Sequence, residues 1–140
     1  MKHQTITNFL KCGLYGWGIE CLFTGVCSFI TKDDKSLKCK TSIWMFPIYG
    51  SAAFLKPMCR LCSKKNIIFR GSIYAALIYL TEYSAGIYLK RKKCCPWDYS
   101  DAKTNIDGVI RLDFAPLWFL VGLFYEHILL PDSLKKTGAK

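Results

Sequence analysis

Charged residues inside apolar stretches are the side chains of this sequence best placed to do chemistry. Glu20 and Glu82 each interrupt a strongly apolar run. An ionisable group in bilayer hydrocarbon is costly unless it is paired, neutralised or hydrated, so such a residue marks a candidate functional site. Arg111 is the expected partner for either glutamate, with Asp107 as a local competitor and Asp113 completing the candidate network. The network is either a polar pathway or substrate site, or a buried ion-pair network that sets helix register.

The eight cysteines suggest a metal site, but their spacing argues against one. Cys59 and Cys62 form a lone C-x-x-C, and Cys94 and Cys95 are adjacent. A structural zinc ion needs four ligands at one point. A single crossing between the two pairs places them on opposite membrane faces, so we expect no metal site, no cofactor and reduced thiols. Cys39 could approach Cys94 or Cys95, and the remaining cysteines are interpreted as packing residues: Cys12, Cys21 and Cys27.

Composition and the distribution of apolar residues indicate a membrane protein. The chain has 140 residues, 51% of them hydrophobic, and a formal net charge of +10, with the basic residues gathered between apolar blocks. We therefore predict an all-α, polytopic membrane helical bundle of about four transmembrane segments, forming one integral membrane domain over residues 1–140. We expect no nucleic-acid partner. The four apolar blocks are 6–30, 42–55, 66–89 and 106–130.

The blocks differ in how well they suit a transmembrane helix, which needs about 20 mostly apolar residues. The first and third are long enough. The second is short and contains Pro47 and Gly50, so it is a kinked short span or a re-entrant segment. The fourth carries charges before Pro116, and its unambiguous apolar part begins near Phe114. Residues 106–113 are interpreted as an interfacial or cavity-lining helical entry, because charges exposed to lipid would be costly there.

Two glutamate-bearing blocks are each followed by a short segment that contains a proline. Glu20 is followed by Pro47, and Glu82 by Pro116. Short, Pro-interrupted segments at corresponding positions of two halves are a feature of transporter binding sites. The residue similarity between the halves is slight, so the pattern is only suggestive of transport.

The segment from Lys90 to Asn105 is typical of a connector beside a membrane. Its basic start, Lys90 to Lys93, suits the head-group layer, and Pro96 prevents continuation of a helix. Trp97 and Tyr99 prefer the interface, while Asp98 and Ser100 can accept hydrogen bonds in a turn; Asn105 and Gly108 suit a second turn. The lysines either attract anionic lipid head groups, at about 1 kcal/mol each, or only flank the helices.

The run "CPWDYSDAKTNIDGVIRLDFAPLWFLVGLFYEHIL" closely resembles a bacterial family labelled "putative ABC-transporter type IV", or CmpB-like ABC transporter permeases. The resemblance rests on Trp97 to Ser100, then Asn105 and Gly108, then Ile110 to Asp113. Earlier segments also match it: "YGWGIE", "TSIWMFPIYG" and "TEYSAG". Together these motifs cover nearly the whole chain.

The resemblance implies a multi-pass protein of the bacterial cell membrane. Our first hypothesis is a permease-like, transport-related subunit that acts with a separate ATPase or as a homo-oligomer. The sequence has no G-x-x-x-x-G-K-[ST] phosphate loop, so ATP hydrolysis through that motif would belong to a partner. The alternative is a non-transport membrane protein that organises lipids, with anionic head groups expected, or partner helices. An enzyme is not expected, because neither glutamate has a convincing nucleophile or metal ligand beside it.

Overall fold

The computed structural model describes residues 2–32 and 35–130, and over these it is mostly helical, as predicted. It contains the α-helices α1 (Lys2–Lys32), α2 (Met45–Gly50), α3 (Lys56–Cys62), α4 (Ile67–Arg91) and α5 (Ala115–Leu129). The 3-10 helices are η1 (Ser51–Leu55) and η2 (Leu112–Phe114), and a two-stranded sheet is formed by β1 (Asn105–Ile106) and β2 (Ile110–Arg111). The chain divides into two compact units, residues 1–51 and 52–140, and each is described by itself.

In the first unit, α2 packs on α1 through aromatic rings that lie over glycines. Phe46 makes edge-to-face contacts with Phe9 and Trp17, at centroid distances of 6.2 and 6.0 Å. A Cβ atom at Gly13 would lie 2.9 Å from the Phe46 ring, and one at Gly50 would lie 2.7 Å from the Phe9 ring. The two helices therefore approach closely because both contact points lack a side chain.

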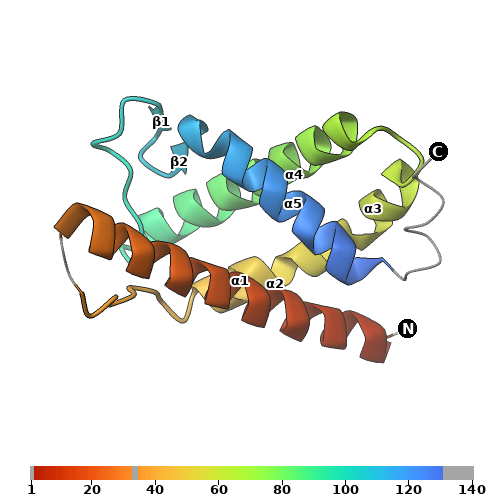
Figure 1. Cartoon of the computed structure of the whole chain (residues 1–140), viewed down its shortest axis with the longest axis horizontal. Coiled ribbons are helices and arrows are strands. Elements are labelled where there is room, and N and C mark those ends of the chain that lie inside the picture. The colour runs from red at the N-terminus through yellow and green to blue at the C-terminus, as the bar shows by residue number, and fades with distance from the viewer. Residues whose placement is uncertain (1, 33–34, 131–140) are drawn as a thin grey trace. The chain divides into compact units, whose positions relative to one another are not determined.

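In the second unit, α4 and α5 pack side by side with the β hairpin at one end of the pair (Figure 1). Their contact is reciprocal: the Phe119 ring of α5 lies over Gly71 of α4, and Tyr74 of α4 lies against Gly122 of α5. Asn66 caps α4, since its side-chain oxygen accepts a hydrogen bond from the Phe69 N–H at 2.7 Å. This pair of helices positions the buried polar groups described below.

The helical entry predicted for residues 106–113 is wrong for most of its length. Residues 105–111 form an antiparallel hairpin, in which Asn105 pairs with Arg111 and Ile106 with Ile110. Only Leu112–Phe114 form a short 3-10 helix before α5. The physical reason is the Asp107-Gly108 pair, whose φ angles of 52° and 68° are both left-handed and cannot belong to a right-handed helix.

Two helical segments are long and apolar enough to cross a membrane: His3–Thr31 and Leu112–Leu129. The first matches the first apolar block. The second falls in the fourth block, which was expected to be marginal, whereas α4 does not pass the same test despite its 25 residues. Arg70 and Glu82, together with many Tyr, Ser and Gly residues, lower the hydropathy of α4. The four-span bundle therefore stays a prediction.

The prolines of the second and fourth blocks lie near the starts of helices. Pro116 lies in the first turn of α5, where a missing N–H costs nothing. Pro47 is the third residue of the six-residue α2, and the chain continues through η1 into α3. Pro116 therefore begins its helix and does not interrupt it, unlike the pattern that we expected.

Candidate functional site

The tip of the β hairpin is a tight turn closed by a hydrogen bond from the Val109 N–H to the Ile106 carbonyl at 3.0 Å. Its two central residues, Asp107 and Gly108, both have positive φ, as in type I′ turns. A Cβ atom at Gly108 would also lie 2.4 Å from the Ser100 hydroxyl. Glycine is thus required at this position both by backbone conformation and by space.

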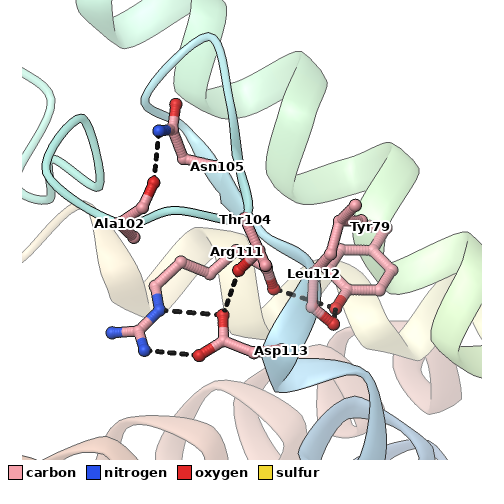
Figure 2. Close-up of polar contacts among 7 residues, drawn as sticks. All are labelled: Tyr79, Ala102, Thr104, Asn105, Arg111, Leu112 and Asp113. Atoms are coloured by element: carbon pink, nitrogen blue, oxygen red, sulfur yellow. Dashed lines mark hydrogen bonds and ion pairs between the residues drawn. The ribbon is translucent and has the colours of Figure 1, made fainter.

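Asn105 ties the hairpin to the preceding connector. Its side-chain nitrogen donates to the carbonyls of Ser100 at 3.2 Å and Ala102 at 2.6 Å, and its side-chain oxygen accepts from the Gly108 N–H at 3.0 Å (Figure 2 shows the Ala102 contact). The Gly108 carbonyl in turn accepts from the Tyr99 N–H at 2.8 Å. The Asn105 and Gly108 turn expected from the sequence is therefore present, and the family-motif residues bond to one another.

Trp97 attaches the connector to both the hairpin and α4. Its indole N–H donates to the Val109 carbonyl at 3.0 Å. Val109 is fully buried, and a Cβ atom at Gly86 of α4 would lie 2.8 Å from the Val109 side chain and 3.2 Å from the Trp97 ring. Gly86 thus provides the space in which this corner of the hairpin packs on the helix.

Asp98 stabilises the turn that Ser100 makes after it. One carboxylate oxygen accepts hydrogen bonds from the Ser100 N–H at 3.0 Å and from the Ser100 hydroxyl at 2.6 Å. The Ser100 hydroxyl, followed by the Ser100 N–H, lowers the pKa of Asp98 below its usual value, since both bonds favour the ionised form. Asp98 is therefore an ionised turn residue, as expected from its position after Pro96 and Trp97.

Arg111 forms a two-pronged salt bridge with Asp113 (Figure 2). Its Nε and Nη2 atoms lie 3.0 and 2.5 Å from the two carboxylate oxygens, and the Thr104 hydroxyl donates to Asp113 at 2.8 Å. The guanidinium group also lies over the Phe114 ring, 4.3 Å from its centroid. The sequence suggested Glu20 or Glu82 as the partner of Arg111, whereas in the structure Arg111 pairs with Asp113, two residues further along the chain.

Two tyrosines of α4 donate hydrogen bonds to the hairpin and to the residue that follows it. The Tyr79 hydroxyl lies 2.9 Å from the Arg111 carbonyl and 3.2 Å from that of Leu112 (Figure 2). The Tyr83 hydroxyl donates to the Asp107 carboxylate at 2.8 Å. Asp107 was expected to compete for Arg111, but in the structure its carboxylate accepts a hydrogen bond from Tyr83.

An open cavity of about 470 Å³ lies beside the Arg111–Asp113 pair. Both signs of charge line it, and Arg111 and Asp113 neutralise one another. Its wall carries polar groups from both the connector and the hairpin. The lining residues are Asp98, Tyr99, Asp101, Ala102, Lys103, Thr104, Arg111 and Asp113.

Glu82 is buried in α4, with only 9% of its surface exposed. Its Oε2 atom has no hydrogen-bond partner among the described residues, nor has the buried Trp118 Nε1 atom of α5. The Trp118 indole interacts with the Glu82 carboxyl, but without the geometry of a full hydrogen bond. Glu82 is therefore a buried carboxyl group whose polar capacity the described chain uses only in part.

A second buried glutamate, Glu126 of α5, has partners from α4. Glu126 Oε1 accepts a hydrogen bond from the Tyr74 hydroxyl at 3.1 Å and lies 3.3 Å from Arg70 Nη1. Arg70, Tyr74 and Glu126 were not among the site residues predicted from the sequence. The signal was present, because Arg70 lies near the start of the third block and Glu126 near the end of the fourth, and antiparallel helices bring such positions together.

Glu20 lies in the first unit, where a tryptophan and a threonine form a hydrogen-bonded chain to it. The Trp17 indole N–H donates to the Thr41 hydroxyl at 2.7 Å, and that hydroxyl donates to Glu20 Oε2 at 2.7 Å. Thr41 belongs to the segment before α2. Glu20 is half-buried, and this hydroxyl satisfies one of its oxygens.

None of the eight cysteines, all of which lie within residues 2–32 and 35–130, forms a disulfide. In the same residues, no group of three or more His, Cys, Asp or Glu side chains is arranged to hold a metal ion. Cys59 and Cys62 are buried. The sequence allowed Cys39 to approach Cys94 or Cys95, whereas the structure places residues 40 and 41 on Thr24 and Glu20 of α1, so that Cys39 lies near Cys21.

No solved structure shows a significant match to this chain. A family model matches residues 7–138, which include most of each unit and all the residues of the connector, the hairpin and the two buried glutamate sites. The chain therefore belongs to the family described as "Putative ABC-transporter type IV".

Proposed function

We propose that this chain is a multi-pass membrane subunit of a transport-related assembly, in which a separate ATPase subunit supplies ATP hydrolysis and further copies of the chain complete the path. Family membership supports the transport-related role. Two helices apolar enough to cross a membrane support a membrane location. The large apolar side chains that the first half of α1 exposes suit contact with lipid: Leu10 is 48% and Leu14 61% exposed.

The observation that carries the proposal is the difference between the two buried glutamates of the second unit. Glu126 is paired with Arg70 and Tyr74, and so resembles a structural ion pair. Glu82 has the Trp118 indole beside its carboxyl without the geometry of a full hydrogen bond, and its Oε2 atom has no hydrogen-bond partner among the described residues. An unsatisfied buried carboxyl group destabilises the fold by itself, so its presence is best explained by a function. We assign Glu82 as the carboxyl group on which transport depends.

The experiment begins with the tagged chain purified in detergent from membranes of the cells that naturally make it. Mass spectrometry then searches for a co-purifying protein that contains a G-x-x-x-x-G-K-[ST] loop. The complex is reconstituted in proteoliposomes, and ATP hydrolysis is followed by released phosphate. Glu82→Gln is expected to lower hydrolysis at least about 10-fold, which corresponds to about 1.4 kcal/mol, while the ATPase still co-purifies.

Two controls separate loss of function from loss of fold. Thr81→Val changes the exposed neighbour of Glu82 and should leave hydrolysis unchanged, because the Thr81 hydroxyl donates to the Leu77 carbonyl of its own helix. Glu126→Gln changes the paired carboxyl group and should lower thermal stability first. The proposal fails if no ATPase co-purifies, or if Glu82→Gln hydrolyses ATP as the wild type does.

One observation favours the alternative of a lipid-organising protein. The side chains of Lys90, Arg91, Lys92 and Lys93 are all exposed at the end of α4. On this alternative, replacing Arg91, Lys92 and Lys93 by alanine would abolish flotation with vesicles of phosphatidylglycerol, while Glu82→Gln would float as the wild type does. Lys90 is kept in that variant because its Nζ atom bonds to the Asp107 carbonyl at 2.8 Å.

A further inference from the structure

The segment from Leu37 to Ser42 lies along the second half of α1 in a defined register. The Lys40 N–H donates to the Thr24 hydroxyl at 3.3 Å, and the Thr41 hydroxyl donates to Glu20 at 2.7 Å. A Cβ atom at Gly25 would lie only 2.9 Å from the Leu37 carbonyl oxygen. The contacts run in opposite directions along the two segments, so the strap, residues 37–42, is antiparallel to α1.

This register brings Cys39 to the level of Cys21 on α1. The two side chains are close enough to interact electrostatically, and neither forms a disulfide. Cys39 is exposed, whereas Cys21 is only partly exposed. Thr24 and Glu20, the helix positions on either side of Cys21, are the ones that hold residues 40 and 41. Independent contacts therefore keep the two sulfur atoms together.

We propose that Cys21 and Cys39 are a thiol pair that closes to a disulfide by exchange with a low-molecular-weight disulfide such as oxidised glutathione. The exposed Cys39 thiolate attacks one sulfur of that disulfide, so that a mixed disulfide forms and one small thiolate leaves. The Cys21 thiolate then attacks Cys39 Sγ, and the second small thiolate leaves. The two cysteine protons end on the two released thiols, and the two cysteines are oxidised as the small disulfide is reduced.

The product would fix the strap covalently to α1. In the reduced protein, the strap is held by hydrogen bonds such as those of Lys40 and Thr41. A disulfide restricts the unfolded chain and opposes separation of the strap from the helix. It would thereby keep Thr41 on Glu20, the one buried-charge candidate of the first unit. Exposure also distinguishes this pair from Cys59 and Cys62, which are buried away from a soluble disulfide.

The test uses the purified full-length protein in detergent. The protein is incubated with oxidised glutathione over a range of ratios to reduced glutathione, blocked with N-ethylmaleimide, digested with trypsin and analysed by mass spectrometry. The expected product joins the tryptic peptide 12–32 to the peptide 39–40, and dithiothreitol separates them. Cys21→Ser and Cys39→Ser should each remove this product. Cys27→Ser is the matched control, because Cys27 lies in the same tryptic peptide and its loss should leave the linkage intact.

Three results would overturn the proposal. Cys39 could be recovered only as its mixed disulfide with glutathione, it could be linked to Cys94 or Cys95, or the linked peptides could come from a dimer on a non-reducing gel. A wild-type monomer that contains the 12–32 to 39–40 linkage supports the proposal without relying on the folding of any variant.

Discussion

Two glycines, Gly71 and Gly122, lie between α4 and α5, and replacing them by alanine should lower the free energy of unfolding by different amounts. The larger loss is expected at Gly122, although the clash distance there is the longer of the two. A Cβ atom at Gly71 would lie 2.2 Å from the Phe119 ring, and one at Gly122 would lie 2.5 Å from Tyr74 Cβ. The Phe119 ring is the far end of a side chain and lines a cavity of about 660 Å³, into which it can turn. Tyr74 Cβ is fixed to the backbone, and Tyr74 is fully buried with its hydroxyl on Glu126.

These contacts give a magnitude for each alanine variant. Overpacking costs about 1–3 kcal/mol, and alanine gains about 1 kcal/mol over glycine inside a helix. For Gly122→Ala, Tyr74 Cβ cannot move away, so the upper end of the overpacking cost applies. The free energy of unfolding should then fall by about 2 kcal/mol. For Gly71→Ala, the lower end leaves a net change of about 0 kcal/mol. Gly18→Ala is the control, since a Cβ atom at Gly18 of α1 meets nothing within 4 Å and should be neutral or stabilising.

The free energy of unfolding of each variant is measured by titration with sodium dodecyl sulfate in mixed micelles, followed by circular dichroism. The expected order of stability is Gly18→Ala, then Gly71→Ala, then Gly122→Ala. The reasoning is refuted if Gly122→Ala is as stable as the wild type, or if Gly71→Ala costs more than Gly122→Ala. The second result would mean that the Phe119 ring cannot turn into the cavity.

Three further predictions concern the connector, the hairpin turn and the buried ion pair. Ser100→Ala should raise the pKa of Asp98 towards its ordinary value, measured by carboxyl carbon NMR; the folded-state pKa is lowered, so this stabilisation is present at neutral pH and lost as the pH falls through that pKa. Gly108→Ala should cost about 1–2 kcal/mol from backbone conformation alone in the same detergent titration, with the clash against the Ser100 hydroxyl adding to it. Glu126→Leu should cost about 3 kcal/mol because it leaves Arg70 partly buried without its carboxylate, and Arg70→Met in that background should recover most of the loss; a double variant no more stable than Glu126→Leu would contradict this.

The apolar blocks predicted where the long helices lie better than they predicted which of these helices are apolar enough to cross a membrane. Long apolar runs indicated α1, α4 and α5, since a helical pattern over many residues leaves few alternatives. The length of the third block suggested a span, but the polar groups by which α4 contacts the hairpin and α5 lower its hydropathy, and α4 is not among the helices apolar enough to cross a membrane. The end of the connector was half predicted: the turn at Asn105 and Gly108 was recognised, but the residues around it were assigned to a helix. The Asp107-Gly108 dipeptide was the stronger local signal for a hairpin.

The charged residues were recognised individually, but their pairing was not predictable from the sequence. Arg111 could reach several carboxylates in principle, and the local choice of Asp113 depends on a 3-10 turn that no periodicity indicates. The pairing of Arg70 with Glu126 joins residues 56 positions apart and requires knowing that α4 and α5 are packed against one another. Sequence patterns report local conformation, whereas ion pairs depend on tertiary contacts.

The attachment of the hairpin to α4 links an exposed surface to the buried Glu82. Four residues of α4 hold the hairpin: Tyr79 through the Arg111 and Leu112 carbonyls, Tyr83 through Asp107, Gly86 by packing, and Lys90 through the Asp107 carbonyl. Their spacing of three or four residues puts them on neighbouring positions of one helix, along the same stretch that contains Glu82. A rotation of α4 that gave the Glu82 oxygen a partner would have to move these four anchors with it. The hairpin would then be displaced or its hydrogen bonds broken, because all four anchors belong to the same helix as Glu82.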